Sequence, residues 1–249
     1  MTDSHDPSVN DASGAGYIPH LALDFVIIGF HEQELKILIL EYENTGLFAL
    51  PGGFVRMNEN LEDAARRVLS ERTGLTNLYL QQFHTFGSVE RSDPDSMRAI
   101  MQGKGLVAED HHWLLRRFVT VGYYALVDFT KVSPQPDSMA DRCDWHEYGR
   151  LPQLMQDHTE IVQFAMRHLR ANLDQELVGF SLLGEAFTMQ TLQNLYETIL
   201  GEKLNRSSFQ RRMLQLDLLE RLEKSYTGKA HKAPYLYRFK KLSIAATAL

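Results

Sequence analysis

The chain has 249 residues, of which 44% are hydrophobic, with a formal net charge of -6 and a single cysteine. This composition allows buried cores in one large or two small domains and excludes a disordered chain, a disulfide framework and a cysteine-rich zinc site. No apolar run approaches the roughly 20 residues of a membrane span, and residues 1–16 lack the apolar segment of a signal peptide. We therefore expect a cytoplasmic protein without a membrane partner, preceded by a disordered leader at 1–16.

The first half of the chain alternates strand-like and helix-like segments. Apolar residues at helical spacing predict a helix over 60–72, which Gly74 ends. The polar stretch 92–116 is expected to be an inserted surface loop with a short helix, and 145–151 a connection. Apolar runs bounded by polar turns predict strands at 20–30, 34–41, 78–86 and 117–129.

Three adjacent polar residues in the insertion, Asp110, His111 and His112, could bind a metal ion. An exposed polar loop is the favoured interpretation, because adjacent side chains rarely converge on one ion without a third fixed partner. We expect neither a metal site nor a cofactor.

Residues 53–75, GFVRMNENLEDAARRVLSERTGL, resemble the Nudix box. In that family a helix presents carboxylates that hold Mg²⁺, and the metal neutralises a substrate diphosphate and orients the attacking water. The family's metal carboxylates fall on Val68, Glu71 and Arg72, so one of the three remains here. The positions that match the box are Gly53, Glu59, Arg67, Leu69, Glu71, Gly74 and Leu75.

The substitutions in the box remove the metal chemistry and keep the shape. Val68 has no ligand atom, and Arg72 places a positive charge where a cation would sit. Glu59 and Arg67 are retained, and in the family this pair ties the loop to the helix. We predict a Nudix architecture with no catalytic residues; an active pyrophosphohydrolase for ADP-ribose or a similar nucleoside diphosphate is the alternative.

The basic charge is concentrated near the end of the chain. Residues 1–159 hold 13 Lys and Arg against 23 Asp and Glu, whereas 200–241 hold 11 against 4. Such a window is typical of a surface that contacts a phosphate backbone, with a solvated charged face as the alternative. A helix is expected over 159–173, with a domain boundary near residue 160.

The basic window contains the pattern of a winged helix-turn-helix. Thr188 is a good N-cap, Gly201 breaks the first helix, and Asn205 or Ser207 can cap the second. Strands at 218–222 and 233–239 enclose a basic tip, which predicts a wing suited to phosphate or minor-groove contact. A protein-interaction module is the alternative. Expected DNA contacts are Asn205, Arg206, Ser207, Ser208, Gln210, Arg211 and Arg212 on the helix and Lys229, His231 and Lys232 in the tip.

The combination resembles the Nudix-related transcriptional regulators of the NrtR type over about residues 20–241. The resemblance implies an α+β protein, with a Nudix-type α/β/α sandwich and mixed sheet at 17–159 and a winged helix-turn-helix at 160–249. The segments that carry it are LPGGF at 50–54, the box at 53–75, HTFGSVER at 84–91, LNRSSFQRRML at 204–214 and APYLYRF at 233–239.

The same resemblance implies a homodimer on double-stranded, palindromic operator DNA. Its effector would be ADP-ribose, as in some members, or a pentose such as arabinose, as in related members, and we expect a repressor. Arg72 would meet the ligand's phosphates in place of the metal, and a hinge at the 160–180 helix would change the register of the two recognition helices. Expected effector contacts are Glu59, Arg67, Glu71, Arg72, Phe86, Arg91 and Tyr124.

Overall fold

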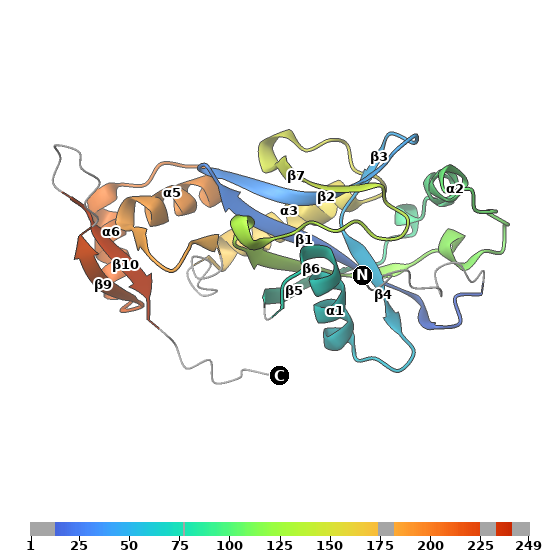
Figure 1. Ribbon diagram of the computed structural model, residues 1–249, viewed down its shortest axis with the longest axis horizontal. Helices are drawn as coiled ribbons and strands as arrows, with labels where there is room; N and C mark the ends of the chain where they lie inside the picture. Colours follow the sequence, from blue (N-terminus) through green and yellow to red (C-terminus); the bar gives the residue numbers. More distant parts are fainter. Residues whose placement is uncertain (1–12, 77, 174–181, 225–232, 241–249) are drawn as a thin grey trace.

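The computed structural model describes residues 13–76, 78–173, 182–224 and 233–240 (Figure 1). Within these residues the first part of the chain forms a seven-stranded sheet with three α-helices around it. The strands are β1 (Tyr17–His31), β2 (Glu34–Tyr42), β3 (Leu47–Ala49), β4 (Gly52–Arg56), β5 (Tyr79–Phe86), β6 (Val119–Val127) and β7 (Arg142–Glu147). The helices are α1 (Leu61–Thr73), α2 (Pro94–Gly103) and α3 (His158–Ala171).

The large sheet is mixed, as predicted. Its order is β3-β2-β1-β6-β5, with β4 also paired to β1 and β7 to β2. The β1–β6 pair is parallel and the other pairs are antiparallel. Residues 25–28 and 37–40 are almost completely buried, because helices cover both faces of the sheet at these strands. That explains why the sequence shows continuous apolar runs there and not an alternating pattern.

The two faces of the sheet carry separate apolar cores. On one face, Phe25, Ile27 and Leu38 pack with Val68 and Leu69 of α1. On the other face, side chains of β1, β2 and β6 pack with Ile161, Ala165 and Leu169 of α3. The predicted α/β/α sandwich is therefore confirmed. The predicted second domain at 160–249 includes α3, but α3 forms a layer of the first part of the chain and leads into the second (Figure 1).

The C-terminal part is a winged helix-turn-helix, as predicted. It contains α5 (Met189–Leu200), α6 (Arg206–Gln215) and a sheet of β8 (Phe187–Thr188), β10 (Tyr235–Phe239) and β9 (Leu219–Lys224), in that order. Thr188 caps α5 by accepting from the Thr191 N–H, and Gly201 ends the helix at a φ of 76°. Asn205 caps α6 by accepting from the Ser208 N–H. The expected wing residues Lys229, His231 and Lys232 lie outside the described residues.

Two segments differ from the sequence analysis. Residues 142–147 form β7, which pairs with β2, so the first three residues of the expected connection at 145–151 belong to the sheet. The insertion at 92–116 is more than a surface loop, because it buries Met101, Leu114 and Leu115 in an apolar cluster of its own and Ile100 in the core on the α1 side of the sheet. Both features depend on contacts with residues far away in the chain, so neither could be predicted from the local sequence. No helix in the described parts of the chain is long and apolar enough to cross a membrane.

Candidate functional site

A cavity of about 950 Å³ lies where α1 and β4 meet the insertion that contains α2. Its lining among the described residues includes six basic and four acidic side chains, so the cavity favours an anionic ligand. The basic residues are Arg56, Arg67, Arg72, Arg91, Lys104 and Arg116, and the acidic residues are Asp24, Glu71, Asp93 and Asp137.

Arg67 and Glu59 form the ion pair expected from the box. The Arg67 guanidinium donates to both Glu59 carboxylate oxygens at 2.8 Å and to the Phe54 carbonyl at 2.9 Å. These hydrogen bonds from Arg67 lower the pKa of Glu59. The pair joins the 56–60 loop to α1, so Arg67 lines the cavity and holds its shape, while Glu59 lies behind it.

The three positions that hold metal in the Nudix family do not fit a metal here. Val68 is 1% exposed and packs so tightly on β4 that a Cβ at Gly53 would lie 2.6 Å from its Cγ2. Glu71 is half exposed, and its carboxylate accepts from Arg67 Nη1 at 3.3 Å. With Arg72 at the third position, the set contains one carboxylate, which already pairs with Arg67, and one guanidinium group, so it does not suit a divalent cation.

Arg72 places a positive charge in the cavity. Its Nη2 lies 3.4 Å from the Gly52 carbonyl, and its Nε is buried with no hydrogen-bond partner in the structure. Among the described residues, no carboxylate forms an ion pair with Arg72. A buried N–H without a partner is costly, so this geometry favours an acceptor supplied by a ligand.

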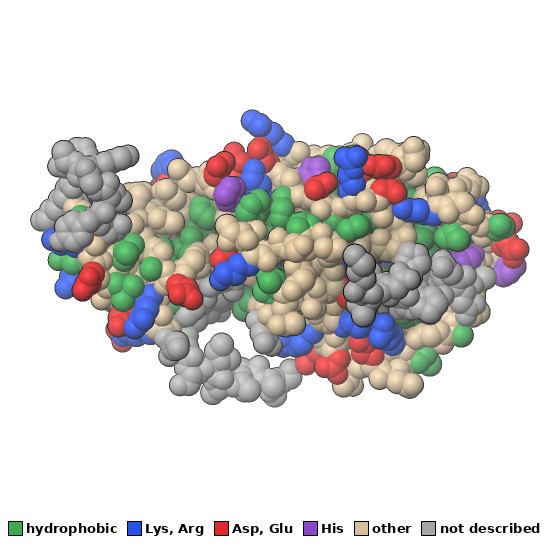
Figure 2. All heavy atoms as spheres, viewed as in Figure 1, with side chains coloured by type: hydrophobic (Ala, Val, Ile, Leu, Met, Phe, Trp, Pro, Cys, Tyr) green, Lys and Arg blue, Asp and Glu red, His purple; other side chains and the backbone are tan. Residues whose placement is uncertain are grey.

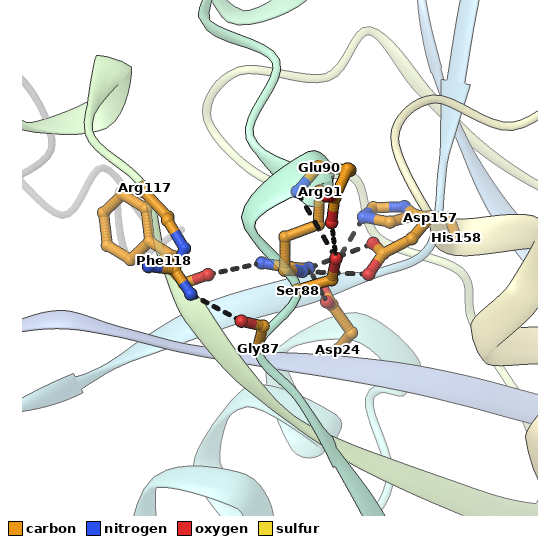
Figure 3. A network of polar contacts seen from close by, with 9 residues as sticks. All are labelled: Asp24, Gly87, Ser88, Glu90, Arg91, Arg117, Phe118, Asp157 and His158. Atoms are coloured by element: carbon orange, nitrogen blue, oxygen red, sulfur yellow. Dashed lines mark hydrogen bonds and ion pairs between the residues drawn. The ribbon is translucent and has the colours of Figure 1, made fainter.

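Arg91 lies in the centre of a buried polar network (Figure 3). It donates from Nε and Nη2 to Asp157 at 2.9 and 3.2 Å, from Nη1 to the Phe118 carbonyl at 2.9 Å, and from Nη2 to Asp24 at 3.4 Å. The Leu50 N–H donates to His158 Nδ1, which leaves the proton on Nε2, 3.9 Å from an Asp24 oxygen. The network ties the cavity wall to the start of α3.

Phe86 and Tyr124, which are among the expected effector contacts, do not line this cavity. Both belong to the core on the α3 side of the sheet. Tyr124 is fully buried with its hydroxyl 3.4 Å from His168 Nδ1, and the Phe86 ring meets Phe164 at 5.5 Å between centroids. The reason is the alternation of a strand, since Tyr123 faces the α1 side and its neighbour faces the opposite side.

Several aromatic residues in or beside the cavity were not among the expected effector contacts. Tyr17 and Phe54 line the cavity beside Phe118 and contact the Trp113 ring, with centroids 4.6 Å apart for Phe54 and Trp113. These side chains come from β1, β4, the insertion and the segment before β6. No local pattern links them, although aromatic rings next to a cationic wall suit a ligand with both a planar ring and phosphates.

The possible metal cluster in the insertion is dispersed. Asp110 pairs with Arg98, and His111 pairs with Glu109. His112 is buried and accepts from the Leu114 N–H at the start of a short 3₁₀ helix. Across the described ranges, no group of three or more His, Cys, Asp or Glu side chains could hold a metal ion.

Helix α6 presents the residues that the sequence analysis assigned to DNA. Phe209 and Met213 are buried against the rest of the winged helix, while Arg206, Ser207, Ser208 and Arg211 are exposed. Gln210 is half-buried and Asn205 is engaged as the N-cap. Arg212 lies over the Tyr196 ring at 5.9 Å from the ring centroid. The outward face of α6 is therefore polar and basic, as a recognition helix requires.

Part of the basic charge of the C-terminal part is neutralised within it. Arg238 pairs with Glu220, and Lys240 pairs with Asp217. Basic and acidic side chains accordingly lie next to one another at the end of the molecule that contains α6, β9 and β10 (Figure 2). Within the described segments, no carboxylate forms an ion pair with Arg206 or Arg211, so their charge stays available on α6.

Comparisons with known proteins agree with the two parts of the fold. A profile described as the NUDIX domain matches residues 19–165, and one described as the NrtR DNA-binding winged helix domain matches 179–239. The ADPR responsive transcriptional repressor NtrR of Acinetobacter baylyi is 31% identical over 228 residues, 89% of this chain and 82% of that protein. An ADP-ribose pyrophosphatase of Methanocaldococcus jannaschii is 27% identical over 152 residues, 60% of this chain and 74% of that protein. The crystal structure of Shewanella oneidensis NrtR with a 27mer DNA matches with a TM-score of 0.66 and 29% identity, covering 88% of this chain and 93% of that one.

Proposed function

This chain belongs to the family of Nudix-related transcriptional regulators that carry an NrtR winged helix, and we propose that it is a repressor whose DNA binding responds to ADP-ribose. The observation that carries the proposal is the combination of a basic recognition helix with a cation-lined Nudix cavity that has lost its metal set. The relative from Acinetobacter baylyi, a repressor responsive to ADP-ribose by name, supports the effector over a pentose.

DNA binding rests on the exposed face of α6. Arg206 and Arg211 would contact phosphates or base edges in the major groove of operator DNA. A gel shift with the DNA upstream of the gene should give a retarded band at low salt. Replacing both arginines with alanine should weaken binding. The slope of log K against log salt concentration should become less steep by about one for each lost phosphate contact.

The matched control for that experiment is Arg66→Ala with Arg150→Ala. Both of these side chains are exposed, neither lies in the winged helix, and the variant loses the same net charge. It should bind as the unmodified protein does. Failure to retard any duplex at low salt would contradict the proposed function.

The effector proposal rests on Arg72. In the absence of a metal, its guanidinium would donate to the diphosphate of ADP-ribose. Arg67 and Glu71 would support the cavity wall beside it, and Arg91 would order the bottom of the cavity. Calorimetric titration in EDTA should show binding of ADP-ribose and none of arabinose. A hydrogen bond to a charged group contributes about 1.5–3 kcal/mol, so Arg72→Gln should weaken ADP-ribose binding by about tenfold or more.

Arg66→Gln is the control for the effector experiment, because Arg66 is exposed on the same helix and does not line the cavity. It should leave the affinity unchanged. If the Arg72 variant binds ADP-ribose as tightly as the unmodified protein, Arg72 does not take the place of the metal at the diphosphate. If the protein binds arabinose, the effector is a pentose.

We further propose that the chain has no hydrolase activity. Val68 and Arg72 at two metal positions support this. The alternative is an active pyrophosphohydrolase, which the remaining Glu71 and the similarity to an ADP-ribose pyrophosphatase favour. ADP-ribose incubated with the protein and Mg²⁺ or Mn²⁺ should remain intact. Release of AMP at ordinary enzyme rates would establish the alternative. We also propose that the protein is cytoplasmic and binds a palindromic operator as a homodimer. Light scattering with and without DNA tests the homodimer.

A further inference from the structure

The outward face of α6 contains one apolar side chain. Leu214 is 45% exposed, although Phe209 and Met213 of the same helix are 3% and 4% exposed. Ser207, Arg211 and Leu214 are four and three residues apart and therefore share one face, opposite the buried pair. Exposed leucines are common on protein surfaces, so exposure alone decides nothing. The position of Leu214 is what suggests a contact with DNA, because Leu214 lies on the same helix face as Arg211, whose charge is available for DNA.

We propose that Leu214 contacts the C5-methyl group of a thymine in the major groove, next to the base pair that Arg211 contacts. This inference rests on the proposed DNA-binding function and adds that α6 recognises a thymine in each half-site. The thymine methyl is the one apolar group on the major-groove edge of the base pairs, and an aliphatic side chain is its complement.

The spacing along the helix agrees with neighbouring base pairs. Three residues of α-helix rise about 4.5 Å, and one base step is about 3.4 Å along a strand. Leu214 thus lies about one base step from Arg211 when the helix follows the groove. Each half-site should therefore contain a thymine adjacent to, or one step beyond, the base pair contacted by Arg211.

Leu216 provides a matched control two residues further along the chain. It is 40% exposed, close to Leu214, and is also a leucine. It forms the C-cap of α6, and two residues turn a helix by about 200°, so it lies on the opposite side from Leu214. A general effect of removing exposed apolar surface would appear in both leucine variants, whereas contact with a base would appear in one.

The experiment removes a single methyl group from the DNA. A duplex is selected by the unmodified protein from random-sequence DNA, and its thymines are replaced one position at a time, in both half-sites, by deoxyuridine. Affinity should fall at one position by about fourfold for each half-site, the effect expected from one buried methyl group. Leu214→Ala should bind the original duplex more weakly and show no difference between thymine and deoxyuridine there. Leu216→Ala should keep the full difference.

The other outcomes overturn the inference in distinguishable ways. If the unmodified protein binds no duplex, the proposed function fails and the inference with it. If the protein binds but no deoxyuridine lowers affinity, or Leu214→Ala retains the deoxyuridine effect, the thymine contact is excluded while DNA binding stands. If Leu214→Ala changes the oligomeric state in light scattering and weakens both duplexes equally, the leucine belongs to a protein interface.

Discussion

Glu59 and Arg67 show how two residues of a catalytic motif can be retained for shape. Their side chains are 14% and 21% exposed, and the bidentate contact fixes the loop that leads into α1. Arg67 also donates to Glu71 and to the Phe54 carbonyl, so one guanidinium organises three parts of the cavity wall. The motif is thus conserved in geometry although its metal positions have changed.

Removal of the Glu59 charge should destabilise the protein. Glu59→Gln leaves the partly buried Arg67 with the longer, more exposed contact to Glu71 in place of its 2.8 Å pair with Glu59, which should lower the free energy of unfolding by about 2 kcal/mol. Denaturation in urea with a fluorescence readout measures this change. Glu62→Gln, an exposed position in the first turn of α1, is the control and should change stability by less than about 0.5 kcal/mol. Equal effects of the two variants would contradict a structural role for the pair.

At the scale of elements, the turn between α5 and α6 depends on one carboxylate. Glu197 accepts from Lys203 Nζ at 2.8 Å, from the Leu204 N–H at 3.0 Å and from Gln193 Nε2 at 2.8 Å. These hydrogen bonds, that of Lys203 first, lower the pKa of Glu197 to about 2. The carboxylate therefore connects the two helices of the helix-turn-helix and sets the start of the recognition helix.

The lowered pKa predicts how the stability of this turn depends on pH. Because the folded-state pKa of Glu197 lies below its ordinary value of 4.5, its contribution is complete above about pH 4.5 and is lost as the pH falls toward 2. The melting temperature of Glu197→Gln should lie below that of the unmodified protein at pH 7, and the difference should shrink as the pH falls. Glu202→Gln, an exposed neighbour, should show no such convergence. A difference independent of pH would exclude this titration.

At the scale of the whole molecule, the sensor and the DNA-binding part share an apolar core. One continuous cluster extends from Val26 and Tyr124 in the sheet through Leu169 of α3 to Leu195 and Phe209 in the winged helix. Arg170 of α3 also donates to the Ile199 carbonyl at the end of α5. Since Asp157 and His158 at the other end of α3 join the Arg91 network, this helix connects the cavity to the recognition unit.

The shared core predicts that both parts unfold together. Trp113 and Trp145 both lie in the sandwich, so tryptophan fluorescence reports that part, whereas far-UV circular dichroism reports the whole chain. The two urea transitions should coincide, and ADP-ribose should move both to higher denaturant. A separate circular dichroism transition without a fluorescence change would show that the winged helix unfolds independently.

What could be predicted from the sequence was local. The Gly53–Leu75 spacing located α1, and Thr188 and Gly201 located the ends of α5, because caps and periodicity depend on neighbouring residues. The start of α6 was narrowed to two candidate caps, of which the structure uses Asn205. The loss of the metal-binding carboxylates could likewise be predicted from the identities of Val68 and Arg72 alone.

The tertiary structure decided which residues surround the cavity. Phe86 and Tyr124 fell on the α3 face of the sheet, because the register of the strands, not the type of residue, determines the face. Asp24, Asp157 and His158 come together only through the crossing of β1 and α3. Convergence of this kind depends on contacts between residues far apart in the chain, so a pattern of neighbours determines the elements, and their packing determines the site.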